Sequence, residues 1–204
     1  MIETLLSFCA IVFLLALSPG PDNIFVLTQS LVYGRKYGIA TVLGLMTGCL
    51  VHTSLVAFGL AGLLKKYPEA LFMVKVFGAA YLLYLAYKIY QHSAPIKLKK
   101  EEVTFKSTTA LFKQGFIMNI LNPKVALFFL ALLPQFLFNE KWSFIVQIYT
   151  LGLLFIVVSF FVFSSFALLA AAISKRFNEN NKSFKYLNYL QIVVFVGIAL
   201  FLFV

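Results

Sequence analysis

The stretch LSPGPDNIF, from Leu17 to Phe25, interrupts an otherwise apolar run with two prolines, a glycine and an acid. The run extends from Thr4 to Val32, and Asp22 is its only charged residue. It is long enough to cross a bilayer as a helix, for which roughly 20 apolar residues suffice. A helix break and a charge are both costly inside lipid. The sequence therefore predicts a broken membrane helix whose break has a functional purpose.

The rest of the chain has the same apolar character. It has 204 residues, of which 62% are hydrophobic and only 12% are charged, too few charges to cover a soluble domain. Five further apolar runs are predicted to cross the membrane: Tyr37 to Leu64, Leu71 to Tyr90, Leu111 to Phe138, Trp142 to Ser174, and Tyr186 to Val204. Runs of this length favour helices over the alternating segments of about 10 residues that form a barrel. We predict an all-α membrane protein with six transmembrane helices.

The N-terminal apolar run could also be a signal peptide. A signal peptide opens with positive charge, whereas this chain has Glu3 and no Lys or Arg ahead of the run. Cleavage would also remove the broken helix. We therefore expect Met1 to Val32 to be a retained span.

The net charge of +10 raises the question of nucleic-acid binding, but the positions of the charges give a simpler explanation. If the basic segment Gln91 to Thr109 is cytoplasmic, 12 of the 17 Lys and Arg residues lie on the cytoplasmic side and three on the other. This bias follows the positive-inside rule. It predicts that both termini lie outside the cytoplasm, and that the basic loops contact lipid headgroups rather than nucleic acid, with Lys97 to Lys100 touching anionic lipid.

The order of three spans, one long basic loop and three spans suggests an internal repeat. We divide the chain into a first three-helix repeat (residues 1–91), the cytoplasmic loop (92–110) and a second repeat (111–204). PGPDNIFVLT, from Pro19 to Thr28, aligns with LNPKVALFFL, from Leu121 to Leu130. An odd number of spans in each half makes the two repeats inverted. Interrupted apolar segments at matching places in inverted repeats indicate a transporter's binding site, although membrane helices also contain Pro and Gly for packing alone.

The predicted breaks expose backbone groups of both polarities. The prolines are Pro19, Pro21 and Pro123. Because proline lacks an N–H and clashes one turn back, we expect the carbonyls of Leu15, Leu17 and Asn119 to be free for a cation or an ammonium group. Gly20 adds backbone freedom and permits close approach. Each half-helix that starts beyond a break offers free N–H groups to an anion.

Two charges follow the aligned prolines, Asp22 after Pro21 and Lys124 after Pro123. If the repeats are related by a twofold axis in the membrane plane, these charges meet near mid-depth, within ion-pair or one-water distance. An isolated charge there costs ~2.5 kcal/mol or more, so such residues pair, face a cavity and carry function. The pair is either part of a transport site or a fixed link between the halves. The two interpretations are compatible if substrate or a proton opens the pair.

A third ionisable residue lies on a glycine-lined helix face. In GLMTGCLVH, the residues Gly44, Gly48 and His52 recur every four positions and share one face. The glycines allow close packing, either within the chain or at the seam of a homo-oligomer. His52 is either a satisfied core residue or a proton-coupling group, since histidine titrates near neutral pH.

The only cysteines, Cys9 and Cys49, lie inside predicted spans. Their number and placement indicate neither a disulfide framework nor a metal site. They are either structural or the two halves of a membrane dithiol relay.

Three stretches resemble the LysE/RhtB family of amino-acid exporters. They are SPGPDNIFVLTQSLVYGRKYGIATVLGLMTGCLVH from Ser18, VKVFGAAYLLYLAYK from Val74 and NILNPKVALFFLALLPQF from Asn119. The resemblance implies a six-span exporter in the bacterial inner membrane that moves small amino acids out of the cell, driven by protons. It implies no catalytic activity and no cofactor. The NPK form is more similar to the homoserine, threonine and leucine branch than to the lysine and arginine branch.

An amino acid is a zwitterion, so its site needs one group of acceptors and one of donors. We expect Asp22 and the freed carbonyls of the first break to bind the ammonium, and Lys124 and the half-helix after Pro123 to bind the carboxylate. Asn23, Asn119 and Asn122 bridge or orient the substrate, and His52 or Asp22 carries the coupling proton. The alternatives are a cation exporter, against which Lys124 argues, a thiol relay, and a structural assembly factor.

Overall fold

All regular elements in the described part of the chain are helices. The structure is a computed structural model, and it describes residues 1–18, 20–67, 69–91, 106–139, 141–170 and 181–203. Most of the basic loop, including Lys97 to Lys100, lies outside the described residues. The all-α prediction is confirmed for the part of the chain that the structure describes.

Two pairs of helices are bent at the predicted breaks. Helix α1 (Ile2–Leu17) and helix α2 (Pro21–Tyr33) meet at 60°, and α6 (Thr108–Ile120) meets α7 (Pro123–Leu132) with its 3-10 extension η2 (Leu133–Phe136) at 54°. Pro21 and Pro123 each occupy the first turn of the new helix, where a missing N–H costs no hydrogen bond. The prolines therefore place both helix restarts where the sequence predicted them.

The remaining helices are straighter. Helix α3 (Arg35–Ser54) continues through a π-helical turn, η1 (Leu55–Leu60), into α4 (Ala61–Lys66), and is followed by α5 (Ala70–Gln91), α8 (Phe144–Leu168) and α10 (Asn181–Phe201). Three helices are long and apolar enough to cross a membrane, and five spans result if each bent pair counts as one. The sixth predicted span, Tyr186 to Val204, is not established, because the described residues of α10 supply only a shorter apolar helix, Asn188–Phe201.

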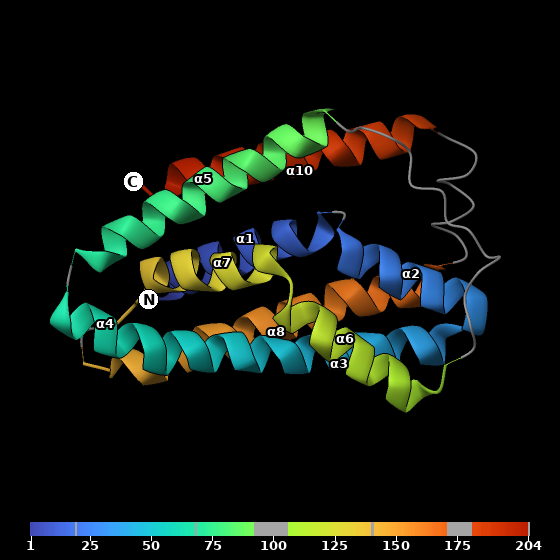
Figure 1. Cartoon of the computed structure of the whole chain (residues 1–204), viewed down its shortest axis with the longest axis horizontal. Coiled ribbons are helices and arrows are strands. Elements are labelled where there is room, and N and C mark those ends of the chain that lie inside the picture. The colour runs from blue at the N-terminus through green and yellow to red at the C-terminus, as the bar shows by residue number, and fades with distance from the viewer. Residues whose placement is uncertain (19, 68, 92–105, 140, 171–180, 204) are drawn as a thin grey trace.

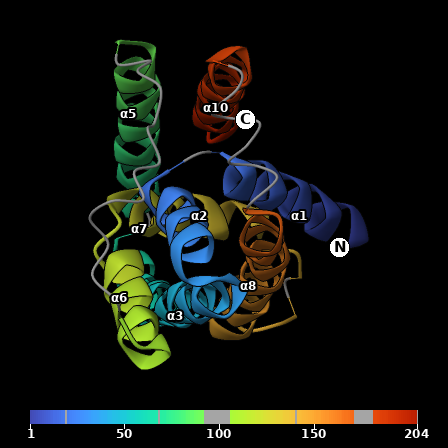
Figure 2. The ribbon, with the colours of Figure 1, turned by 90° about the vertical axis from the view of Figure 1, so that its right-hand side faces the viewer.

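The helices form three rough layers (Figure 1). Helices α5 and α10 pack together on one side, α3, α6 and α8 lie on the other, and α1 and α7 run between them, as the end-on view also shows (Figure 2). Helix α3 contacts both α6 and α8, whereas α7 links the middle layer to α5. Both bends therefore lie in the interior of the bundle.

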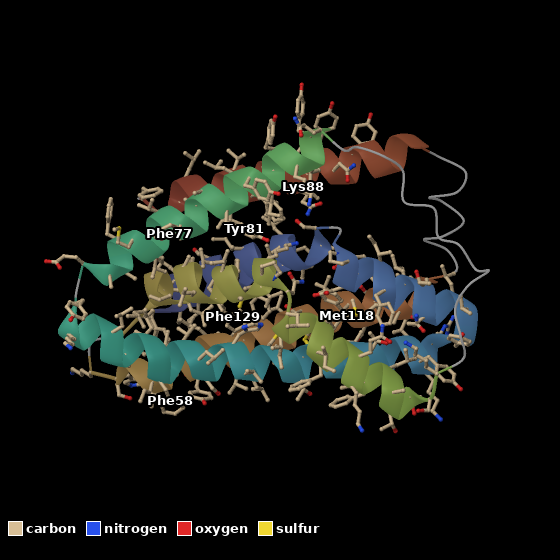
Figure 3. All side chains as sticks on the ribbon, viewed as in Figure 1. Phe58, Phe77, Tyr81, Lys88, Met118 and Phe129 are labelled. Carbon is tan, nitrogen blue, oxygen red and sulfur yellow. The ribbon has the colours of Figure 1, made fainter. Side chains whose placement is uncertain are left out.

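The outer surface is apolar, as a lipid-facing surface is. Phe58 and Phe77 point away from the bundle and are 63% and 67% exposed, whereas Phe129 lies between α7 and α3 and is fully buried (Figure 3). A soluble protein would not expose so many large apolar side chains. Together with the apolar helices, this surface identifies a multi-pass membrane protein.

Glycines bring α3 and α6 into close contact. A Cβ added at Gly44 would collide with the backbone carbonyl of Phe112, and one at Gly115 would lie 2.5 Å from the carbonyl oxygen of Thr41. A Cβ at Gly48 would lie 2.7 Å from Oδ1 of Asn119. In this structure Gly44 and Gly48 face α6 of the same chain, and their close contact sets the position of Asn119 beside α3.

Candidate transport site

The two bends border one cavity in the interior of the bundle. The space it leaves for the centres of water molecules is about 40 Å³, enough for roughly three waters. Its lining residues are Leu15, Ala16, Gly20, Pro21, Asp22, Asn23, Leu45, Met46, Cys49, Asn119, Asn122, Lys124, Val125, Phe155, Ser159 and Phe163. The cavity thus joins the charged residues at both bends with apolar side chains of α3 and α8.

Asn122 connects the two bends. Its side-chain amide donates a hydrogen bond of 2.9 Å to Oδ2 of Asp22, and its Oδ1 accepts one of 3.0 Å from the backbone N–H of Lys124. Asp22 is buried, with only 6% of its surface accessible. One asparagine therefore links the acid on α2 to the start of α7.

The Lys124 ammonium lies beside the turn between α1 and α2. A Cβ added at Gly20 would lie 3.8 Å from Nζ of Lys124, and Nζ stands 4.9 Å from the centre of the Phe195 ring, a cation–π distance. Lys124 and Asp22, both within the described residues, form no direct ion pair. Because they line the same cavity, a water or a ligand can lie between them.

Two further asparagines border the cavity with different partners. The side-chain amide of Asn23 donates a hydrogen bond of 2.8 Å to the carbonyl oxygen of Ala16, which caps the end of α1. Asn119 is 3% exposed, and its Oδ1 lacks a hydrogen-bond partner among the described residues. Asn23 thus fixes the first bend, whereas Asn119 keeps an unused acceptor.

His52 lies behind Asn119 and does not line the cavity. Its Nε2 is 3.1 Å from the backbone carbonyl oxygen of Asn119, and its ring centre is 5.7 Å from that of Phe129. A carbonyl only accepts, so Nε2 carries the hydrogen of this bond. His52 therefore reaches the cavity only through Asn119.

The expectation that the breaks leave free carbonyls is wrong at two positions. The carbonyl of Leu15 accepts a bond of 3.2 Å from the backbone N–H of Ser18, because the last turn of α1 tightens before the bend. The carbonyl of Asn119 accepts from the backbone N–H of Asn122 and from His52. Pro19 lies outside the described residues, so the effect expected of its missing N–H stays a prediction.

The helix starts also differ from expectation. Asn122 caps α7 through the backbone N–H of Lys124, so this group is not free for an anion. Helix α2 has no side-chain cap at Gly20, but its first turn carries Asp22, a negative charge that already lies near the free N–H groups. Neither half-helix therefore offers an open N-terminus to an anion.

The two cysteines differ in their surroundings. Both are free thiols, and Cys49 is buried in the cavity wall whereas Cys9 lies elsewhere on α1. Within the described residues, no group of three His, Cys, Asp or Glu side chains could hold a metal ion together. Neither the thiols nor the acids therefore form an assembled redox or metal centre in this part of the chain.

Several cavity residues were not singled out from the sequence. Met46, Phe155 and Phe163 line it with apolar side chains, and Ser159 adds a hydroxyl from α8. The apolar residues look like any other membrane-facing residue in the sequence. Ser159 could have been noticed as a polar residue deep inside an uncharged span.

A multi-pass helical protein with two broken helices around a cavity that contains an acid and a lysine belongs to the class of membrane transporters. The family model described as "LysE type translocator" matches residues 13–204. The chain therefore belongs to the LysE type translocator family.

Two relatives of this chain carry efflux names. The homoserine/homoserine lactone efflux protein of Salmonella typhimurium is 34% identical over 84% of this chain and 85% of its own length. The leucine efflux protein of Salmonella choleraesuis is 31% identical over 91% of this chain and 87% of its own length. An uncharacterized membrane protein of Bacillus subtilis is 28% identical over 97% of both chains. No solved structure matches this chain.

Proposed function

We propose that this translocator exports small amino acids across the bacterial inner membrane in exchange for protons. The observation that carries the proposal is that Asp22 and Lys124, from two separate helix breaks, line one buried cavity and are linked through Asn122. Opposite charges at a fixed separation match the ammonium and carboxylate of a zwitterion. The efflux of homoserine and leucine named for the relatives supports the same substrate class.

Each end of the substrate has a partner in this arrangement. Asp22 binds the ammonium, while Lys124 binds the carboxylate. In this structure the side-chain amide of Asn122 donates a hydrogen bond to Asp22, and the Lys124 ammonium lies over the Phe195 ring. Substrate binding therefore exchanges these contacts for ligand contacts without leaving either charge unpartnered, which would be costly in a buried site.

The helix contacts support the inverted repeat as part of this proposal. If α1–α2, α3 and α5 correspond to α6–α7, α8 and α10, a twofold axis pairs α3 with α8 and α5 with α10, and both pairs are in contact. The same operation exchanges the α1–α8 contact with α6–α3, and α2–α8 with α7–α3, and all four exist. The charged residues would then lie at the repeat interface.

Alternating access follows from the apolar packing on the two sides of the cavity. Leu15 and Phe155 belong to one buried apolar cluster, whereas Leu45, Met46 and Phe163 belong to another. Because the cavity holds only a few waters, an amino acid must enlarge it. Rocking of one repeat against the other would separate one cluster at a time and open the cavity to one side.

The direct test is an efflux screen in cells loaded with a panel of amino-acid dipeptides, with and without an uncoupler. Cells that express the protein should release particular amino acids faster than cells with an empty vector, and the uncoupler should abolish release against a gradient. Equal release for every amino acid in the panel would contradict the proposal.

The proposed topology places both termini outside the cytoplasm and the basic loop inside. In a cysteine-free background, an impermeant thiol reagent added from the periplasmic side should modify a Val204→Cys variant and spare a Lys99→Cys variant. The physical reason is the distribution of Lys and Arg, which fixes orientation during insertion. The opposite labelling pattern would show that the charge bias has been misassigned.

For the coupling proton we propose His52 or Asp22, and His52 is tested first. The variant His52→Gln can still donate an amide N–H to the Asn119 carbonyl but cannot carry a proton, and His52→Ala loses both functions. Both variants should lose uphill efflux driven by a pH gradient, yet retain counterflow exchange of substrate in proteoliposomes.

Near-normal uphill export by both variants would make His52 a structural residue. Normal export by His52→Gln together with a defect in His52→Ala would assign its role to the hydrogen bond with Asn119 alone.

A further inference from the structure

The hydroxyl of Ser159 is used differently from most hydroxyls in this protein. In membrane helices, Ser and Thr side chains commonly donate to the carbonyl one turn earlier. The residues that do so here are Ser18, Ser30, Thr41, Thr47, Thr53, Ser54 and Thr150. Ser159 is 1% exposed, and its Oγ has no hydrogen-bond partner among the described residues. A buried hydroxyl without a partner is unusual and requires an explanation.

Ser159 belongs to the wall of the substrate cavity. It comes from α8, whereas Asp22, Asn122 and Lys124 come from the two helix breaks. The other α8 residues in the wall, Phe155 and Phe163, are apolar. Ser159 is therefore the one hydroxyl in the described wall of the cavity, and its Oγ is not paired with any other group of that wall.

The positions of these groups separate the ends of a bound amino acid. The charged groups at the breaks hold the ammonium and carboxylate, so the side chain of the substrate extends toward the remaining walls, which α3 and α8 supply. A hydroxyl on that side chain can pair with Ser159, which both donates and accepts. A methyl group in place of the substrate hydroxyl would leave the Ser159 hydroxyl buried and unpaired. A binding site with a buried polar group therefore disfavours a substrate that lacks the matching group.

We propose that Ser159 is a specificity-determining residue that favours small amino acids with a side-chain hydroxyl over their apolar isosteres. The proposal rests on the proposed function of the same cavity. It assigns the choice among amino acids to α8, and leaves the recognition of the zwitterion to the two breaks.

The test compares homoserine with norvaline, which differ by a hydroxyl in place of a terminal methyl. Exchange of each labelled compound is measured in proteoliposomes that contain the full-length protein. The wild type should prefer homoserine, and Ser159→Ala should reduce the ratio of homoserine to norvaline exchange roughly tenfold, the loss of about one hydrogen bond. Ser159→Ala removes an unpartnered hydroxyl and should not weaken the fold.

The matched control is Ser164→Ala. Ser164 also lies on α8, is 8% exposed and has an unpartnered Oγ, but it does not line the cavity. Its replacement should leave the ratio at the wild-type value. A change of the exchange ratio in Ser159→Ala but not in Ser164→Ala would therefore show that the effect arises in the cavity and not from loss of any buried hydroxyl on α8.

The outcomes distinguish a failure of the role proposed for Ser159 from a failure of the proposed function. If the wild type exchanges both compounds equally, or if Ser159→Ala keeps the wild-type ratio, the role of Ser159 is overturned while the proposed function stands. Equal effects of Ser159→Ala and Ser164→Ala would also overturn it. If the wild type exchanges no amino acid at all, the proposed function falls and this inference falls with it.

Discussion

Replacing Asp22 by Asn, or Lys124 by Met, is expected to destabilise the protein more than replacing both residues together. Each single change leaves one buried charge without the opposite charge in the cavity. Breaking a well desolvated pair costs ~3–5 kcal/mol, and the cost here should be smaller because Asp22 and Lys124 form no direct ion pair. The double variant Asp22→Asn/Lys124→Met removes both charges, so most of this cost disappears. Unfolding of the purified protein in detergent would measure all three variants against the wild type.

The chosen substitutions isolate charge from shape. An Asn at position 22 can still accept the hydrogen bond from Asn122, and a Met at position 124 can still pack its sulfur on the Phe195 ring. Amino-acid exchange in proteoliposomes should nevertheless be lost in the double variant, because both anchors of the zwitterion are gone. The double variant would then recover stability relative to the single variants, while exchange stays lost.

Lys113→Met is the control for removing a positive charge, because Lys113 is exposed on α6. It should leave both stability and exchange near the wild-type values. Normal exchange by the double variant would make the charges a structural link and place the transport site elsewhere. Single changes whose effects simply add would show that the two charges do not interact.

The second large effect is expected at Gly44, where a single methyl group has no room. A Cβ there would collide with the carbonyl of Phe112, which is backbone and cannot rotate away. Gly44→Ala should therefore push α6 from α3 and cost at least the 1–3 kcal/mol that is typical of overpacking. We expect a sharp loss of monodisperse protein after extraction and a lower melting temperature in what remains.

Gly197→Ala on α10 provides the matched control, since a Cβ at Gly197 would meet no atom within 4 Å. Alanine is the better helix former, so this variant should be as stable as the wild type or slightly more stable. If Gly44→Ala and Gly197→Ala melt at the same temperature, the close contact of α3 and α6 is not required by the fold.

The sequence was most informative where proline and charge interrupt apolar runs. Pro21 and Pro123 predicted both helix restarts, because a residue without an N–H is tolerated only in the first turn of a helix. The apolar runs predicted six spans, and five of them are found when each bent pair counts as one.

The details of the site were less predictable, because they depend on side-chain contacts between distant segments. The pattern around Pro123 could not show that Asn122 would cap α7 and also contact Asp22. The position of His52 behind Asn119 depends on how closely Gly48 lets α6 approach. Ser159 carries no motif, and its unpartnered hydroxyl is visible only in three dimensions.

Binding of the amino acid in this cavity can be tested through the native thiol of Cys49 in its wall. In a Cys9→Ser background, the rate at which a small methanethiosulfonate reagent modifies Cys49 is measured during turnover, with increasing concentrations of a transported amino acid. We expect the rate to fall and saturate with substrate, and we expect Asp22→Asn/Lys124→Met to abolish this protection. Modification of Cys49 at an unchanged rate, under conditions in which the same amino acid is being exchanged, would contradict binding in this cavity.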